Sequence, residues 1–441
     1  MKKKIFCILL LGISFALFSP AQNIISRVSL SLDGSRDGIY RKGQTVKVFA
    51  RTQSETPALM QVYINGKSNG DPKKITLPAG QSEIFSGSWD EATAVMVRLD
   101  NPNARKDSTL IGAVVAPEEF KPGFEEPSDF AGFWDGQLAS MRAMPMVPVL
   151  IPIQVSGWEG DLVKCYDVEI NCTGDVPVRG YLAIPRDAAP GSLPIIITAH
   201  SAGKMTDSWT QSKVETAVRY ARMGGGAIAL DINAHGMKGN MDESYYKDLE
   251  DKLHGYESRK ITDHESFYFR TMFLRMVRAL DFLCTLPQWD GTRVAVTGTS
   301  QGGAQSAALA GLDSRVGLIA VDVPAMWDMG GILRGRSSSW GKHLEREGIN
   351  SPAAQVVPYY DGANFLRHYH GKLVVNVGLI DTTCPPASVW SAYNVCPSTD
   401  KVIYAQPSKG HSRFSLTREA SAPLHKKIDQ SISNALKNYC K

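Results

Sequence analysis

The sequence predicts an α/β protein with a doubly wound, mostly parallel sheet, preceded by a small all-β domain. Three observations lead to this prediction. From Pro194 onward, continuous apolar runs alternate with helical patterns, as expected for strands buried on both faces of a parallel sheet. One of these runs leads through a sharp Gly-x-Ser-x-Gly turn into a helix of small residues. Upstream, residues 22–116 show short alternating strands and almost no helical pattern. A chain of 441 residues is long enough for both units.

The first 21 residues have the pattern of an export signal. Lys2, Lys3 and Lys4 precede an apolar stretch over residues 5–18, and Ser19-Pro20-Ala21 supplies small residues before a cleavage point. We expect a signal peptide over residues 1–21 and an exported protein, periplasmic or secreted, that begins near Gln22. A short N-terminal membrane anchor is the alternative. No later apolar run is long enough to span a bilayer.

Composition excludes some classes of function. The formal net charge of +4 is small for this length and no long basic run occurs, so nucleic acid is not an expected partner. Of seven cysteines, six follow the signal, and neither Cys-x-x-Cys nor His-Glu-x-x-His occurs. The sequence therefore predicts no metal site and no cofactor.

Residues 22–116 are expected to form an immunoglobulin-like β-sandwich. Apolar residues alternate with polar ones around Val28, Val46, Met60 and Val95, and Asn65-Gly66 is a hairpin turn signal. Residues 117–127, rich in proline and acidic residues, are the predicted linker. The task of the sandwich stays open between glycan binding, protein contact and support.

Residues 128–441 are the predicted α/β domain, and its elements follow in order. A helix carries Phe130 to Met141, and a hairpin follows it. The remaining predicted strands and helices are 194–199, 214–222, 227–231, 266–286, 294–299, 304–312, 318–321, 373–377, 387–393, 402–404 and 423–438.

The turn between residues 298 and 303 is the most informative stretch. Strand, Gly-x-Ser-x-Gly and helix in this order form a nucleophile elbow, which lifts the serine hydroxyl above the sheet. Gly298, Gly302 and Gly303 are needed because a Cβ there would collide with the neighbouring strand or helix. Ser300 is therefore the predicted nucleophile of an α/β-hydrolase fold.

An acid and a histidine follow Ser300 in the order that α/β-hydrolases require. Asp381 comes directly after strand 373–377 and is the predicted orienting acid. His411 lies between the last strand and the last helix and is the predicted general base. Asp322, at the end of the strand after the elbow, is the rival acid, whereas Asp361 is expected to be a structural hydrogen-bonding residue.

Two backbone N–H groups are the predicted donors of an oxyanion hole. The first is that of Gln301, the residue after the nucleophile, and the second is that of Ser201, in the loop after strand 194–199. Residues 324–360 are long for a connection, and Trp327 and Trp340 within them are candidate substrate contacts. Packing of this insertion is the alternative.

These residues resemble the acetyl xylan esterase/cephalosporin C deacetylase family, carbohydrate esterase family seven. The likeness lies in Gly-x-Ser-Gln-Gly-Gly at 298–303, Gly-x-x-Asp-x-x-Cys-Pro-Pro at 378–386, the segment 359–364, and Arg275 to Leu280 before the elbow. It covers residues 127 to the C-terminus. The resemblance implies removal of acetyl groups from the hydroxyls of xylan fragments or small acetylated sugars, without metal, by proteins that are often closed oligomers. The expected partner is therefore an acetylated oligosaccharide or a small ester, and this chain is a possible homo-oligomer.

Three departures from the family pattern bear on substrate preference. Ser201 stands where an aromatic residue is usual, Ala234-His235-Gly236-Met237 replaces an Arg-Gly-Gln block, and Ser412 replaces a glutamate. His235 is kept as a candidate substrate contact. A serine hydrolase for other esters or peptides, and a glycan-binding protein with an inactive hydrolase domain, remain the alternative functions.

Overall fold

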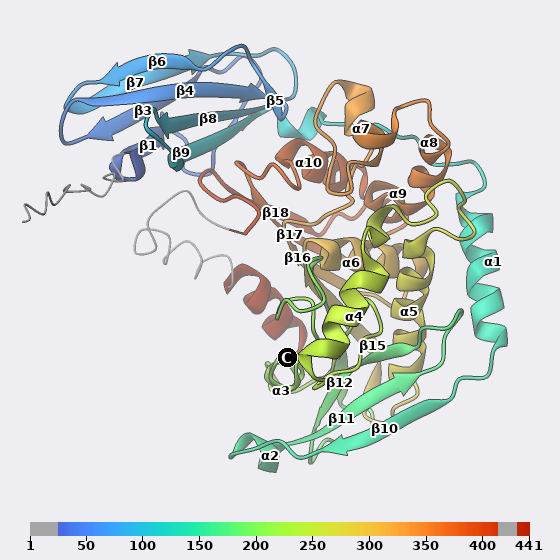
Figure 1. Cartoon of the computed structure of the whole chain (residues 1–441). Helices are drawn as coiled ribbons and strands as arrows, with labels where there is room; N and C mark the ends of the chain where they lie inside the picture. Colours follow the sequence, from blue (N-terminus) through green and yellow to red (C-terminus); the bar gives the residue numbers. More distant parts are fainter. Residues whose placement is uncertain (1–24, 413–429) are drawn as a thin grey trace, which may run out of the picture.

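The structure is a computed structural model that describes residues 25–412 and 430–441. It consists of a nine-stranded sheet flanked by helices and, beside α10 and β18, a two-sheet β-domain (Figure 1). The predicted signal segment, residues 1–21, and the start of the predicted last helix lie outside the described residues.

The large sheet has the strand order β10-β11-β12-β14-β13-β15-β16-β17-β18. The six strands β14-β13-β15-β16-β17-β18 are parallel to one another, and β10, β11 and β12 add antiparallel strands at the β14 edge. The parallel strands are β13 (Leu193–Ala199), β14 (Ile228–Ile232), β15 (Trp289–Thr299), β16 (Leu318–Asp322), β17 (Lys372–Gly378) and β18 (Lys401–Gln406). The mixed α/β fold with a mostly parallel sheet is thus confirmed.

Helices cover both faces of this sheet because successive strand residues are apolar on both sides. Ile195 and Ile197 face the larger core, with α1 (Phe130–Ala143), α5 (Tyr268–Leu283), α6 (Gln301–Leu312), α9 (Gly362–Leu366) and α10 (Pro386–Val395). Ile196 faces the other side, where Leu436 of the helical residues 430–439 packs. On that side α3 (Val214–Ala221) covers β11 (Val163–Ile170) and β12 (Val178–Pro185).

Several elements were not predicted from the sequence. Strand β10 (Pro148–Ile153) contains two prolines, which an edge strand tolerates because its outer N–H groups need no partner. The others are α2 (Glu159–Leu162), α4 (Glu243–Leu253) and η3 (Tyr256–Ser258). Residues 324–360 form η4 (Gly331–Arg334), α7 (His343–Glu347), α8 (Ala353–Val356) and η5 (Val357–Tyr360).

The N-terminal β-domain packs two sheets against each other. One sheet has the order β1-β3-β7, and the other β2-β9-β8-β4-β5, with β6 paired to β4. After η1 (Ile25–Arg27), the strands are β1 (Ser29–Leu32), β2 (Ile39–Tyr40), β3 (Val46–Thr52), β4 (Thr56–Ile64), β5 (Lys67–Ser68), β6 (Lys73–Leu77), β7 (Gly80–Gly87), β8 (Thr93–Asn101) and β9 (Ala104–Val115). Asn65 and Gly66, both with positive φ, form the predicted turn between β4 and β5.

Residues 117–127, predicted as a linker, lie against the α/β unit. Their first turn is η2 (Pro117–Glu119). Asn394 Nδ2 of α10 donates to the carbonyl of Pro117 at 2.8 Å and to that of Phe120 at 2.9 Å. The N–H of Gly123 donates to Asp328 Oδ1 at 2.6 Å. The segment is therefore fixed in place by specific partners.

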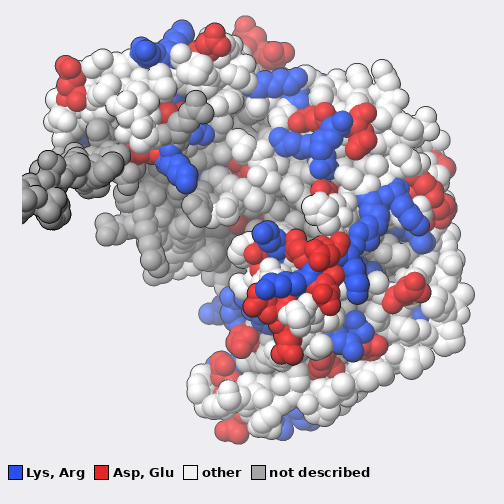
Figure 2. Space-filling model, viewed as in Figure 1, with Lys and Arg blue, Asp and Glu red and all other residues white. Residues whose placement is uncertain are grey.

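The surface agrees with the small net charge. On the face shown in Figure 2, basic and acidic side chains are interspersed and do not gather into one basic patch. Within residues 25–412 and 430–441, none of the helices combines the length and apolar character needed to cross a bilayer. The six cysteines in this part of the chain form no disulfide bond with one another.

Candidate active site

Ser300 occupies a strained turn between β15 and α6. Its backbone angles, φ 56° and ψ −118°, lie in a region that a residue with a Cβ rarely adopts, at a typical cost of about 1–3 kcal/mol. The N–H of Ser300 donates to the carbonyl of Asp322 on the neighbouring strand at 3.1 Å. Such strain is characteristic of a nucleophile elbow, where it places the hydroxyl above the end of the sheet.

The glycines around Ser300 are required by close backbone contacts. A Cβ on Gly298 would lie 2.5 Å from the carbonyl carbon of Gly302, and one on Gly302 would lie 2.4 Å from the carbonyl oxygen of Ala199. A Cβ on Gly303 would lie 2.5 Å from Pro324 Cβ. These are the collisions with strand and helix that the sequence predicts.

The structure brings the three predicted side chains together. His411 Nε2 lies 2.9 Å from Ser300 Oγ, and His411 Nδ1 lies 2.8 Å from Asp381 Oδ2. The other carboxylate oxygen, Asp381 Oδ1, accepts the N–H groups of Thr383 and Cys384 at 2.8 and 2.9 Å. Because this carboxylate accepts at Nδ1, the proton of a neutral imidazole sits there, and Nε2 is free to accept from the serine hydroxyl.

The rival acid, Asp322, has a different partner. Its Oδ2 accepts from Lys409 Nζ at 3.2 Å, and its Oδ1 has no hydrogen-bond partner within the described residues. Burial raises the pKa of Asp322 against the opposing effect of the Lys409 ammonium. Asp381, and not Asp322, is therefore the carboxylate that contacts the imidazole of His411. Asp361, as predicted, is structural, because it accepts the N–H groups of Asp328 and Met329.

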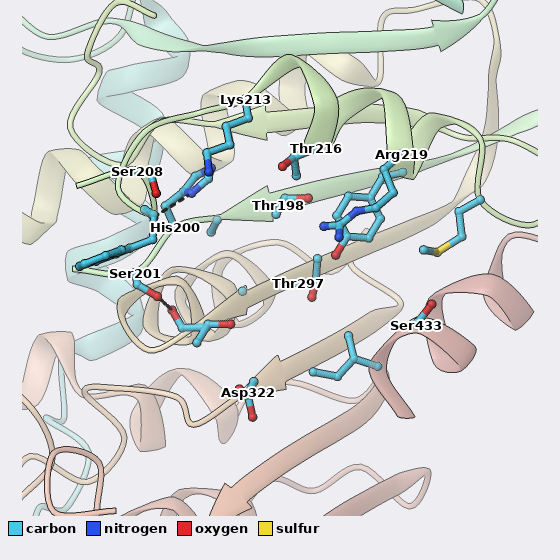
Figure 3. A pocket seen from close by; sticks show the side chains of 17 residues that line it. Thr198, His200, Ser201, Ser208, Lys213, Thr216, Arg219, Thr297, Asp322 and Ser433 are labelled. Carbon is cyan, nitrogen blue, oxygen red and sulfur yellow. Dashed lines mark hydrogen bonds between the residues drawn. The ribbon is translucent and has the colours of Figure 1, made fainter. Parts of the chain in front are cut away.

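The two predicted oxyanion donors come from the first residue of α6, Gln301, and from the loop after β13, Ser201. Ser201 follows β13, and its hydroxyl donates to the carbonyl of Thr299 at 3.0 Å, which ties this loop to the residue before the nucleophile (Figure 3). Among the described residues, neither Ser201 N–H nor Gln301 N–H donates a hydrogen bond. Both groups are therefore available to a ligand. His200, Ser201 and Asp322 line one part of a cavity of about 480 Å³.

Comparison with known proteins adds to this geometry. The sequence profile described as acetyl xylan esterase (AXE1) matches residues 116–422, more than half of the chain. The chain belongs to the acetyl xylan esterase family. It is accordingly a carboxylic ester hydrolase, and the resemblance stated from the sequence motifs is confirmed.

Relatives of this acetyl xylan esterase family member agree in fold. The chain is 28% identical over 385 residues to acetyl esterase Axe7A of Xylanibacter ruminicola, covering 83% of each chain. The acetyl xylan esterase from Paenibacillus sp. R4 has 24% identity and a TM-score of 0.58, over 72% of this chain and 98% of that one. Acetyl xylan esterase 1 from Thermoanaerobacterium sp. JW/SL YS485 has 21% identity and a TM-score of 0.55, over 71% and 97%.

In this esterase, His200 supports the loop that carries Ser201. Its Nε2 lies 2.9 Å from Asp231 Oδ1, and its Nδ1 lies 3.1 Å from the carbonyl of Trp209. Burial alone would lower the pKa of His200, but the charge of Asp231 and its hydrogen bond raise it above its ordinary value. Both ring nitrogens of His200 face acceptor oxygens. The protonated imidazole can donate to both of them, whereas a neutral imidazole has only one N–H group to donate. In Figure 3, His200 lies beside Lys213.

The prediction that Trp327 contacts substrate is wrong. Its side chain is 0% exposed, and its indole N–H donates to the carbonyl of Gly303 at 3.3 Å, so it packs beneath the elbow helix. Trp340 is half-buried with its ring edge against Phe269, the two ring centroids 6.2 Å apart. The insertion thus places Trp327 in the core, which was the alternative expectation.

His235 is also buried and is not placed to bind a substrate. Its Nδ1 lies 2.8 Å from the hydroxyl of Tyr268, and burial together with the charge of Arg275 lowers its pKa to about 3. Its ring packs edge-on against Tyr256, whose hydroxyl donates to the side chain of Gln301. His235 therefore supports the residue after the nucleophile. Sequence reasoning missed Tyr256 and Tyr268 because no motif marks an isolated tyrosine.

One group of possible metal ligands lies within the site. The ligand atoms of Asp381, Cys384 and His411 lie within 4.8 Å of one another. Burial raises the pKa of the Cys384 thiol well above its ordinary value, and the charge of Asp381 raises it further. Both carboxylate oxygens of Asp381 are already engaged, Oδ2 with His411 Nδ1 and Oδ1 with the N–H groups of Thr383 and Cys384. The arrangement suits proton transfer better than metal binding.

Proposed function

We propose that this protein is a serine esterase that removes O-acetyl groups from xylan-derived or other acetylated carbohydrates. The observation that carries the proposal is the series of hydrogen bonds from Ser300 Oγ through His411 to Asp381, at 2.9 and 2.8 Å. Membership of the acetyl xylan esterase family supports an acetylated carbohydrate as the substrate.

The proposed mechanism has two halves. Ser300 Oγ attacks the ester carbonyl while His411 Nε2 takes its proton, and the imidazolium is stabilised by Asp381. The N–H groups of Gln301 and Ser201 stabilise the negative charge on the tetrahedral oxygen. His411 then returns the proton to the departing sugar hydroxyl, which leaves an acetyl ester on Ser300. In the second half, water loses a proton to His411 and attacks this ester. The bond between Ser300 Oγ and the acetyl carbon then breaks, His411 returns the proton to Ser300 Oγ, and acetate is released.

A direct experiment tests this function. The mature protein is expected to release acetate from acetylated xylooligosaccharides and from p-nitrophenyl acetate, and to be labelled at Ser300 by a fluorophosphonate probe. Ser300→Ala should abolish hydrolysis and labelling. An unchanged rate in Ser300→Ala would exclude the mechanism. A series of p-nitrophenyl esters of increasing chain length separates an acetyl esterase, which loses rate beyond a few carbons, from a hydrolase of larger acyl groups.

The proposal extends to organisation and location. Residues 1–21 are a cleaved signal, residues 22–116 an immunoglobulin-like sandwich, residues 117–127 a linker, and residues 128–441 the esterase domain of an exported homo-oligomer. N-terminal sequencing of the exported protein should begin near Gln22. Light scattering of the purified protein measures its oligomeric state, and a monomer would exclude that part of the proposal.

A further inference from the structure

The N-terminal sandwich and the esterase domain share a hydrophobic core. Ala94 of β8 and Val114 of β9 are buried in the same cluster as the apolar residues of the large sheet and of α10. A domain that moved freely on a tether would not bury side chains in this way, since separating the two units would expose them to water. The sandwich is therefore packed as a part of one unit.

Strand β9 contacts the two loops that carry Asp381 and His411. The N–H of Gly112 donates to the carbonyl of Pro407 at 2.8 Å. A Cβ on Gly112 would lie only 2.2 Å from the carbonyl oxygen of Leu379, two residues before the acid. The backbones of β9 and of the acid loop are thus in direct contact.

A second glycine of the sandwich meets the same pair of loops. A Cβ on Gly38 would lie 2.7 Å from Leu379 Cδ1 and 3.1 Å from Pro407 Cγ. The carbonyl of Gly38 accepts the N–H of Val114 at 2.8 Å, which holds it beside β9. Gly38 and Gly112 together form a small flat surface against Leu379 and Pro407.

The acid and histidine loops are joined to each other behind this surface. The N–H of Leu379 donates to the carbonyl of Gln406 at 3.0 Å, and the N–H of Ile380 donates to the carbonyl of Lys409 at 3.2 Å. A displacement of Leu379 or Pro407 is therefore passed to Asp381 and His411 through two short stretches of backbone.

A third contact fixes the orientation of the sandwich. The turn at Asn65 and Gly66 inserts against the 324–360 insertion, where Ser337 N–H donates to the carbonyl of Asn65 at 2.9 Å. The carbonyl of Ser337 in turn accepts the hydroxyl of Ser388 on α10 at 3.4 Å. Three separated points of contact define one rigid placement.

We infer that the sandwich is a positioning part of the active site: its glycine surface at Gly38 and Gly112 sets the distance between Asp381 and His411. The inference rests on the proposed function, because it assigns the sandwich a part in that reaction. It differs from a glycan-binding role, which would affect polymeric substrates and leave small esters unaffected.

Gly112→Ala is the matched test. Its φ is not positive, so alanine fits the backbone of β9, and the clash is with Leu379, whose carbonyl oxygen, carbonyl carbon and Cβ would lie 2.2, 2.5 and 2.8 Å from the added Cβ. Displacement of the loops by about 1 Å is expected to lower kcat for p-nitrophenyl acetate about 10²-fold, while KM stays within about twofold. Gly132→Ala on α1, where an added Cβ meets nothing within 4 Å, is the control and should behave as wild type.

A second pair of variants tests the inference independently, should Gly112→Ala fail to fold. Gly38 and Gly34 both lie in the sandwich with positive φ, at 75° and 66°, so alanine strains both backbones alike. Only Gly38 faces the loops, whereas an added Cβ on Gly34 meets nothing within 4 Å. Gly38→Ala should lower kcat on the small ester more than Gly34→Ala, with thermal melting to confirm that both variants are folded at the assay temperature.

The outcomes are distinct. Wild-type kcat in folded Gly112→Ala and Gly38→Ala would overturn the inference, as would a loss confined to polymeric acetylated xylan. If the wild-type protein neither hydrolyses p-nitrophenyl acetate nor labels at Ser300, the proposed function itself fails, and the inference fails with it. A lower kcat with unchanged KM in both variants, and not in their controls, supports it.

Discussion

Replacement of Asp381 by asparagine exchanges one carboxylate oxygen for an amide nitrogen, with almost no change in shape. Asp381 Oδ1 accepts the N–H groups of Thr383 and Cys384, so the amide oxygen must take that position. The –NH₂ group then faces His411 Nδ1 and donates to it. The imidazole proton must move to Nε2, the atom that has to accept the proton of Ser300.

This tautomer cannot act as the base, so the loss should be large. Asparagine at the acid position of such triads typically lowers kcat by about 10⁴-fold, or about 5 kcal/mol of activation free energy. Asp322→Asn is the matched control, because the N–H of Ser300 bonds to the backbone carbonyl of Asp322, which the substitution leaves in place. Its kcat should stay within about tenfold of wild type, since it removes no group that acts on the transition state.

Steady-state hydrolysis of p-nitrophenyl acetate by both variants measures this, with thermal melting to confirm that each is folded. The reasoning is refuted if Asp381→Asn keeps more than about a tenth of the wild-type kcat, or if Asp322→Asn falls equally far.

Three further predictions address the surroundings of the site. Gly302→Ala, whose Cβ would lie 2.4 Å from the carbonyl of Ala199, should lower kcat at least about 10²-fold through displacement of the elbow, as measured by ester hydrolysis on refolded, soluble protein. Trp327→Ala should lower the free energy of unfolding by about 3–5 kcal/mol, measured by chemical denaturation, with KM unchanged; a raised KM would restore it as a substrate contact. The pKa of His200 is raised in the folded state by Asp231, so its contribution to stability is complete below the unfolded pKa of about 6.5 and is lost as pH rises through the folded value. Denaturation of wild type and His200→Gln at several pH values should therefore show a difference that shrinks as pH rises, and a constant difference would contradict it.

Much of the α/β fold could be predicted because its strands are buried on both faces. The run from Pro194 to Ala199 has no charged residue and only one polar residue, Thr198, so its composition predicts a strand buried on both faces of a parallel sheet. Ser300, Asp381 and His411 could be located because each follows a strand, and the carboxyl ends of parallel strands meet at one edge. The order of these three residues and their places after predicted strands were therefore enough to predict that they meet.

Other features depend on packing that a linear pattern does not contain. Trp327 and Trp340 look alike in sequence, yet one lies beneath α6 and the other is half-buried, which only the path of the insertion decides. The support that Tyr256 gives to Gln301 joins residues 45 positions apart without any motif. Gly112 reads as an ordinary strand glycine until the backbone of Leu379 is placed beside it.

The docking of residues 117–127 has a consequence for how this architecture can be recombined. Its partners come from distant segments: Asn394 on α10, Asp328 in the insertion, and Arg336, which donates to the carbonyl of Lys121 and pairs with Asp328. A flexible tether lets one module be exchanged for another, because only its length matters. Here a transplanted sandwich would have to bring along a matching insertion and a matching α10, so these three segments are expected to be inherited, or engineered, as one block.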